Sequence, residues 1–287
     1  MSSLFGDLTW LRAVCGEGNF WWNEAPETGL PAVGLRQWRR WGVVPTLSMP
    51  PFTPAISFAK FWPNGQKSLR EVINRLPTVA DCSLTADLHP AQLPLFHRTG
   101  FRARAWLTYQ YSLSPEIDCA RYFNRNRRRE LKAVAALRPE IELIPLAAAE
   151  HIFASHLAER NALAPGGLAL HRLAPFYGPN GPVQAMGVRD EMNGEKWAAA
   201  LLTVRDGTRA HALYNARSAA ASGQLSYLYR RQINALAAAG VTHFDFNGSM
   251  LPGVTDYLGS FGGEAVTRYR LRRSVRWLAA LRALKGG

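Results

Sequence analysis

Asp245, Asn247 and Ser249 form a short polar cluster near the carboxyl end of the chain. They lie at the tip of a predicted strand, residues 242–246, in which two phenylalanines share one face and Asp245 lies on the other. Polar side chains at a strand tip are where α/β proteins usually place their chemistry. A structural role is the alternative, because the same carboxylate can cap the Asn-Gly turn that follows.

The loop between a strand predicted at residues 208–215 and a helix predicted at residues 224–239 is a second candidate site. Its side chains are mostly small, so a phosphate could approach the backbone, and the unpaired N–H groups and dipole of the helix N-terminus favour negative charge. The spacing fits neither a Walker loop nor a dinucleotide glycine motif. The predicted phosphate-binding residues are Ala216, Arg217, Ser218, Ser222, Gly223 and Gln224. A merely flexible connection is the alternative.

The most basic segment is residues 114–138, predicted as a helix with Ser114 as N-cap and proline at its first position. Arginines and a lysine follow one face, and an apolar stripe follows the other: Ala120, Phe123, Leu131, Val134 and Leu137. Arg127 falls within the apolar stripe, where an unpaired guanidinium would be costly. It therefore either extends to water or reaches a carboxylate or a bound phosphate. The exposed arginines are either a solvated face or a surface for RNA or phospholipid.

One order of elements occurs twice: helix, strand, short helix, strand. The first set comprises residues 68–76, 81–88, 90–98 and 102–113, and the second comprises the helix and strand around the polar cluster, a short helix from Pro252 and a strand at 266–271. We interpret this as two divergent copies of one unit in an α/β protein with a mixed sheet. The predicted divisions are residues 1–113, a basic connecting helix 114–139, residues 140–273 and a tail 274–287.

Composition narrows the class of protein. The chain has 287 residues, 47% of them hydrophobic, and its net charge of +13 gives a pI of about 10.2. This balance indicates a polyanionic partner, such as a nucleotide cofactor, RNA or an anionic membrane, unless it reflects only a solvated, arginine-rich surface. Three cysteines without metal or redox spacing and no apolar run of spanning length predict a cytoplasmic protein. The seven histidines show no ligand spacing, so we predict no catalytic metal.

The tail, residues 272–285, is predicted as a basic amphipathic helix. Its apolar residues are Trp277, Leu278, Leu281 and Leu284, and its basic residues include Arg272, Arg276 and Arg282. Such a helix can lie on the inner face of an anionic membrane. Docking onto its own domain is the alternative.

These elements resemble the GNAT acyltransferase fold, in which a small-residue loop and helix N-terminus hold the pyrophosphate of acyl-coenzyme A. The sequence is similar in particular to the Fem-type branch, which has two GNAT-like halves in one chain. The motifs that carry the likeness are Phe244-Asp245-Phe246-Asn247-Gly248-Ser249, Pro252-Gly253-Val254, Phe261-Gly262-Gly263-Glu264, the Arg-rich Lys132-Ala133 helix and Pro50-Pro51-Phe52-Thr53-Pro54. The chain departs from some tRNA-dependent members because it has no heptad segment for a coiled-coil arm.

The resemblance implies an N-acyltransferase in which an amine attacks an activated acyl carbon directly in a cleft between the halves, without a metal. Asp245 is then the candidate base, and the Tyr214 hydroxyl or the 216–224 backbone the oxyanion donor. The candidate substrate contacts are Arg127, Asn247, Ser249, Tyr257 and Phe261, although the last two are also typical core residues. The donor is acyl-coenzyme A or aminoacyl-tRNA, and the acceptor a small molecule or cell-envelope precursor. A degenerate module that binds RNA or an anionic membrane without catalysis is the alternative.

Overall fold

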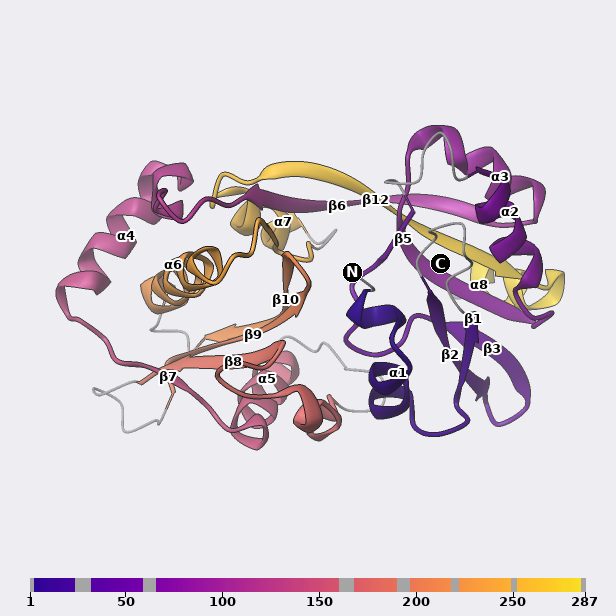
Figure 1. Cartoon of the computed structure of the whole chain (residues 1–287), viewed down its shortest axis with the longest axis horizontal. Coiled ribbons are helices and arrows are strands. Elements are labelled where there is room, and N and C mark those ends of the chain that lie inside the picture. The colour runs from indigo at the N-terminus through magenta and orange to yellow at the C-terminus, as the bar shows by residue number, and fades with distance from the viewer. Residues whose placement is uncertain are drawn as a thin grey trace. The chain divides into compact units, whose positions relative to one another are not determined.

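The computed structural model describes residues 3–23, 32–58, 66–159, 168–189, 197–217, 222–248 and 252–284. The chain divides into two units, one formed by Met1–Leu107 with Thr267–Gly287 and the other by Thr108–Val266. Strands β6 (Arg102–Ser112) and β12 (Glu264–Ser274) each begin in one unit and end in the other (Figure 1). We therefore describe each unit by itself.

The first unit is a mixed sheet with the strand order β1-β2-β3-β5-β12, with β4 also paired to β5. The strands are β1 (Phe20–Asn23), β2 (Val33–Arg40), β3 (Val44–Ser48), β4 (Ile56–Ser57) and β5 (Asp81–Asp87). The helices are α1 (Leu8–Cys15), α2 (Gln66–Arg75), α3 (Leu93–Arg98) and α8 (Arg276–Leu284), with short 3-10 turns at Leu4–Gly6 and Pro90–Gln92. An aliphatic core beneath α2 and α3 includes the fully buried Leu47, Leu69 and Leu271.

The second unit continues the strand order from β6 as β11-β10-β9-β8-β7. These strands are β7 (Ile141–Leu143), β8 (Val183–Val188), β9 (Ala199–Asp206), β10 (Arg209–Arg217) and β11 (His243–Asp245). The helices are α4 (Arg125–Ala136), α5 (Leu146–Glu159), α6 (Ser222–Ala238) and α7 (Pro252–Gly259), with 3-10 turns at Cys119–Tyr122 and Leu170–Phe176. Helices α5 and α6 pack on opposite faces of β9 and β10 (Figure 1).

The predicted internal repeat is present, and its two copies exchange their last strands. The copies are α2-β5-α3-β6 and α6-β11-α7-β12, and in each the first strand pairs in parallel with the preceding hairpin, β3 with β5 and β10 with β11. The last strand of each copy then pairs antiparallel with the other copy, β12 with β5 and β6 with β11. For this reason the carboxyl half of β12 and the tail belong with the first unit, whereas the sequence placed residues 140–273 together.

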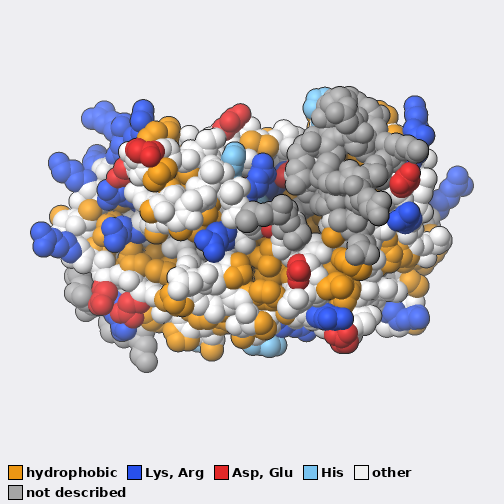
Figure 2. All heavy atoms as spheres, viewed as in Figure 1, with side chains coloured by type: hydrophobic (Ala, Val, Ile, Leu, Met, Phe, Trp, Pro, Cys, Tyr) orange, Lys and Arg blue, Asp and Glu red, His pale blue; other side chains and the backbone are white. Residues whose placement is uncertain are grey.

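The basic connecting segment differs from the predicted helix of residues 114–138. It forms a 3-10 turn at Cys119–Tyr122 and then α4, which begins at Arg125 because the Asn124 side chain accepts a hydrogen bond from the Arg127 N–H. Leu131 and Val134 are buried as predicted, but Leu137 is 73% exposed at the helix end. The basic face of α4 is exposed, and Figure 2 shows Lys and Arg side chains gathered over it.

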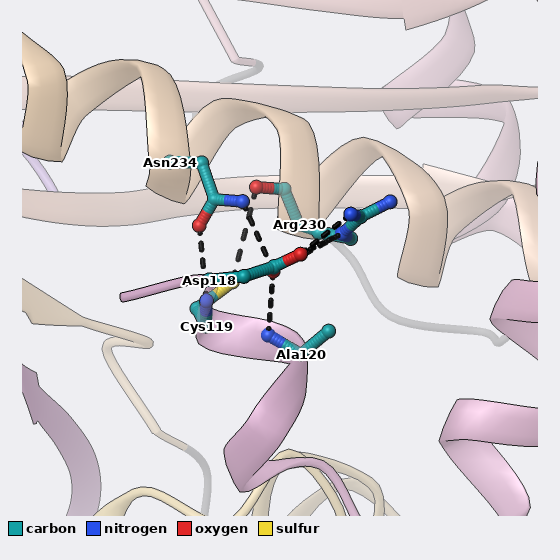
Figure 3. Close-up of polar contacts among 5 residues, drawn as sticks. All are labelled: Asp118, Cys119, Ala120, Arg230 and Asn234. Carbon is teal, nitrogen blue, oxygen red and sulfur yellow. Dashed lines mark hydrogen bonds and ion pairs between the residues drawn. The ribbon is translucent and has the colours of Figure 1, made fainter. Parts of the chain in front are cut away.

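Asp118 attaches the 3-10 turn to α6 (Figure 3). Its carboxylate accepts hydrogen bonds from the Arg230 guanidinium at 2.5 and 2.9 Å, from the Asn234 amide at 3.0 Å and from the Ala120 N–H at 2.9 Å. The Cys119 N–H in turn donates to Asn234. These charge-assisted bonds hold the start of the segment against α6 before α4 begins.

Candidate functional site

The candidate site is built where β10 and β11 part. The two strands pair in parallel only over Arg209–His211 and His243–Asp245, after which β10 continues to Arg217. A bulge between Ala212 and Tyr214 shifts the register of β10 against β9 at this same point. A bulge leaves its extra residue outside the regular ladder and turns the strand. Beyond His211, β10 is therefore no longer paired with β11 in the described residues.

Asp245 is held at the start of this divergence by an extensive hydrogen-bond network. The residue is 3% exposed, and its Oδ1 accepts from the Thr108 hydroxyl at 2.6 Å and from the Asn247 N–H at 2.6 Å. Its Oδ2 accepts from the Gln110 side-chain amide at 2.8 Å. Thr108 also accepts from the Gly248 N–H at 2.9 Å, so the carboxylate and hydroxyl together shape the turn after β11. The expected turn-capping role is thus present, and Asn247 adopts the left-handed conformation, with φ of 50°.

His211 lies beside this carboxylate. It is paired in register with Asp245, is 6% exposed, and its Nδ1 lies 3.9 Å from Asp245 Oδ2. Both side chains are on the sheet face opposite the phenylalanines that contact α6. A buried imidazole next to a carboxylate is an arrangement that can transfer a proton. The divergence of β10 and β11 therefore has two titratable groups.

Sequence reasoning missed Thr108, Gln110 and His211 as partners of Asp245. Thr108 and Gln110 are 137 and 135 residues away in the sequence and meet Asp245 only because β6 pairs with β11. Alternation along residues 102–113 does place both on the face opposite Tyr111. That pattern identifies the face but not the partner strand.

The bulge also changes which way Tyr214 points. Regular alternation predicted Ala210, Ala212 and Tyr214 on one face. The two alanines do belong to the core under α6, but the Tyr214 ring packs against Phe153 of α5, with centroids 5.8 Å apart. Burial raises the pKa of its hydroxyl. Tyr214 thus lies on the α5 face of the sheet, three residues beyond His211, the residue paired with Asp245.

The N-terminus of α6 is packed closely against α4. A Cβ added at Gly223 would lie 2.4 Å from Val134 Cγ2 and 3.3 Å from the Glu130 carbonyl oxygen. Glycine is therefore required here by helix packing, independently of any ligand. Ala216 is fully buried in β10, and Gln224 is partly exposed in the first turn of α6. Ser218 lies outside the described residues, as does the side chain of Ser222.

Arg127 reaches across from α4 to the end of α7. Its side chain is 16% exposed, and it donates to Glu130 at 2.6 Å and to the Ser260 hydroxyl at 2.8 Å. The guanidinium carbon lies 4.3 Å from the centroid of the Tyr257 ring. Of the alternatives left open by the sequence, the carboxylate partner is the one observed.

Tyr257 connects the two arginines of this region to α6. Its hydroxyl lies beside Ser226 of α6, and its pKa is raised to about 12, chiefly by burial and against the opposing charges of Arg127 and Arg217. Arg217 is the last residue of β10 and directly precedes the α6 loop. Two guanidinium groups therefore lie near the start of α6, where a helix N-terminus already favours an anion.

The other predicted substrate contacts include one residue that is too deeply buried for a substrate to reach. Phe261 is fully buried, and its ring contacts Phe123, Tyr229 and Phe246 in the main core, so no substrate can reach it without unfolding that core. Ser249 lies outside the described residues.

Within the part of the chain that the structure describes, His, Cys, Asp and Glu side chains form no group that could hold a metal ion. No helix among these residues is long and apolar enough to cross a membrane.

Comparison with known proteins gives the class of fold. No family model matches the chain, and no curated protein matches it in sequence. The crystal structure of FemX superposes over 94% of this chain and 93% of its own, with a TM-score of 0.66 and 11% identity. L-PGS from Bacillus licheniformis matches over 99% and 96% of the two chains, with a TM-score of 0.55 and 11% identity.

A further solved structure agrees with these two. The C-terminal domain of a putative lysylphosphatidylglycerol synthetase from Agrobacterium fabrum matches over 92% of this chain and 87% of its own, with a TM-score of 0.55 and 13% identity. Identities this low show likeness of fold. The chain therefore shares the fold of FemX, of L-PGS and of this synthetase domain.

Proposed function

We propose that the protein is an N-acyltransferase that transfers an acyl, acetyl or aminoacyl group from a phosphate-bearing carrier to an amine. The observation that carries the proposal is the Asp245–His211 pair at the divergence of β10 and β11, with Arg217 ending β10 directly before the loop to the α6 N-terminus. A proton acceptor and an anion-binding helix end are the two features that this reaction needs.

In the proposed step, the acceptor's amine nitrogen attacks the acyl carbonyl carbon of the donor. The nitrogen attacks as the neutral amine and forms the carbon–nitrogen bond as the bond to the carrier's sulfur or ribose oxygen breaks. The proton that the nitrogen loses passes to the Asp245–His211 pair, which returns it to the departing sulfur or oxygen. The backbone N–H groups at the β10 bulge and the Tyr214 hydroxyl stabilise the negative charge that develops on the carbonyl oxygen. Thr108 and Gln110 orient the carboxylate.

The donor is proposed as acyl-coenzyme A or aminoacyl-tRNA, both of which present phosphate to Arg217 and to the start of α6. The fold likeness to FemX, to L-PGS and to a putative lysylphosphatidylglycerol synthetase domain supports an amine of a cell-envelope precursor as the acceptor class. We place this use at the cytoplasmic side of the membrane. Ser218, Ser222, Gln224 and Asn247 remain proposed ligand contacts, as does the partly buried Tyr257.

A donor screen tests the proposal. The protein is incubated with an amine acceptor and either acyl-coenzyme A species or charged tRNA, and product is followed by mass spectrometry. Asp245→Asn is expected to lower kcat by roughly 100-fold to 10,000-fold, because proton removal slows without the carboxylate. Thr108→Val is expected to lower kcat less and to shift the pH profile, since it removes one hydrogen bond from the carboxylate.

Glu116→Gln is the matched control, because its carboxylate is fully exposed and distant in the chain from the pair. Turnover in Asp245→Asn equal to that of the parent and of Glu116→Gln would remove Asp245 as the base. Failure of every acyl-coenzyme A and charged tRNA to give product would leave the non-catalytic alternative, binding of RNA by the exposed arginines of α4 (Figure 2). A steep salt dependence of tRNA binding without turnover would support that alternative.

A further inference from the structure

Exposed apolar side chains gather at one end of the first unit's sheet. Trp41 and Val43 form the tip of the β2–β3 hairpin and are 63% and 67% exposed. Val275, Trp277 and Leu281, at the start of α8 and along it, are 37%, 51% and 43% exposed. We call these five residues the apolar rim.

The backbone brings both parts of the apolar rim together. The Ala80 N–H donates to the Pro45 carbonyl at 3.1 Å, and the Val275 N–H donates to the Ala80 carbonyl at 2.9 Å. Pro45, Ala80 and Val275 are therefore neighbours across three adjacent chain segments, so about 10 Å separates the outer two. The hairpin tip begins just beyond Pro45, and α8 begins just beyond Val275.

Helix α8 is docked on its own unit but leaves an apolar face open. Leu278 is 1% exposed and attaches the helix, whereas Trp277 and Leu281, one turn apart on a neighbouring face, point outward. The sequence left docking and membrane contact as alternatives for the tail. In the described part of α8, one face is docked on the unit, and another face is left open for contact with a membrane.

Arginines surround the apolar rim. Arg39 and Arg276 are exposed, and the Arg40 guanidinium lies 5.4 Å from the Trp38 ring and 6.0 Å from the Trp41 ring. Arg40 and Arg272 share one buried carboxylate, Asp81, at 3.5 and 3.3 Å. Because two guanidinium groups share one carboxylate there, the cluster retains positive charge, which Arg39 and Arg276 increase.

We propose that the apolar rim docks the protein on the surface of an anionic phospholipid bilayer, independently of the transferase reaction. Tryptophan prefers the membrane interface, where its ring is apolar and its N–H can meet water, and arginine beside it meets anionic headgroups. The aliphatic members, Val43, Val275 and Leu281, argue for lipid over RNA, because they offer no flat surface for base stacking. Trp41 and Trp277 are the main insertion residues, and Arg39 and Arg276 supply the charge complementarity.

Vesicle flotation tests this docking surface. The parent is expected to float with vesicles of phosphatidylcholine and about one third phosphatidylglycerol, and to bind pure phosphatidylcholine at least roughly tenfold more weakly. Trp41→Ser with Trp277→Ser is expected to lower the partition coefficient at least roughly tenfold, since each ring would bury apolar area in the interface. Arg39→Gln with Arg276→Gln is expected to lower it to a similar extent and to remove most of its salt dependence.

Leu137→Ser is the matched control, because Leu137 is 73% exposed at the end of α4 in the other unit and should not alter binding. Thermal unfolding of each variant near that of the parent excludes misfolding as the cause. Three outcomes would overturn the proposal: vesicle binding unchanged in the tryptophan double variant, equal loss in Leu137→Ser, or no vesicle binding while the same variants abolish RNA binding or self-association.

Discussion

At the scale of single residues, Asp118 is a side chain whose charge contributes to stability. Its bonds to Arg230, followed by those to Asn234 and Ala120, hold the pKa of this carboxyl well below its usual value despite partial burial. A carboxyl with a lowered pKa stabilises the fold above its ordinary pKa, and this stabilisation is lost as pH falls toward the lowered value. The loss should therefore begin below about pH 4, the ordinary pKa of aspartate.

Asp118→Asn is expected to destabilise the protein by about 1 kcal/mol at pH 7, a value reduced for the partial exposure of the pair. The variant should also lose less stability than the parent between pH 4 and lower pH, because its amide does not titrate. Urea unfolding across this pH range measures both effects. Equal pH slopes in the two proteins would show that Asp118 does not carry this dependence. Glu264→Gln, which changes an exposed carboxylate at the start of β12, is the control.

Residue-level prediction from sequence succeeded where chemistry limits the choices. A guanidinium within an apolar stripe must find a partner, and Arg127 finds Glu130 three residues further along its helix. A carboxylate before Asn-Gly can cap the turn, and Asp245 does. The partners Thr108 and His211 come from other strands, so their identity depends on strand order, which local patterns do not contain.

At the scale of elements, Gly223 sets how closely α4 and α6 approach. Gly223→Ala would place a methyl 2.4 Å from Val134 Cγ2, which requires the helices to shift. We expect a loss of about 1–3 kcal/mol in the free energy of unfolding. Val134→Ala in the same chain should recover part of that loss, and a double-mutant cycle from urea unfolding measures the coupling.

Gly253→Ala is the matched control, because Gly253 lies in α7 and nothing is within 4 Å of the position of its added Cβ. Alanine is the better helix former, so this variant should be neutral or slightly stabilised. If Gly223→Ala is as well tolerated as Gly253→Ala, glycine at 223 is not required for packing and a ligand contact becomes its stronger explanation.

Element boundaries were less predictable than element order. Ser114 and Pro115 are good helix-start residues, yet α4 begins only at Arg125, because Asp118 is bound to α6 and Asn124 provides the actual cap. The bulge in β10 was not predictable from alternation either, because Ala212, Leu213 and Tyr214 form a regular pattern in sequence. Tertiary contacts override local preference in both cases.

At the scale of the whole molecule, the repeat was predictable but the exchange of its last strands was not. Each copy has its own helix, strand, helix and strand, so the order of elements is visible in the sequence. Local sequence patterns do not show whether the last strand pairs within its own copy or with the other copy, because the paired strands are far apart in the sequence. The predicted division at residue 273 therefore differs from the observed one at Thr267.

Because β6 and β12 are shared, loss of β12 packing in the first unit should destabilise both units together. Leu271 of β12 is fully buried in the first unit's core. Leu271→Ala is expected to lower the free energy of unfolding by about 2–5 kcal/mol. Hydrogen exchange should then show equal losses of protection in β5 and in β9. Val43→Ala, at a position that is 67% exposed, is the control. It should change the free energy of unfolding of neither unit by more than about 0.5 kcal/mol. Faster exchange confined to β5, with β9 unchanged, would mean that the units unfold independently and that strand sharing does not couple them.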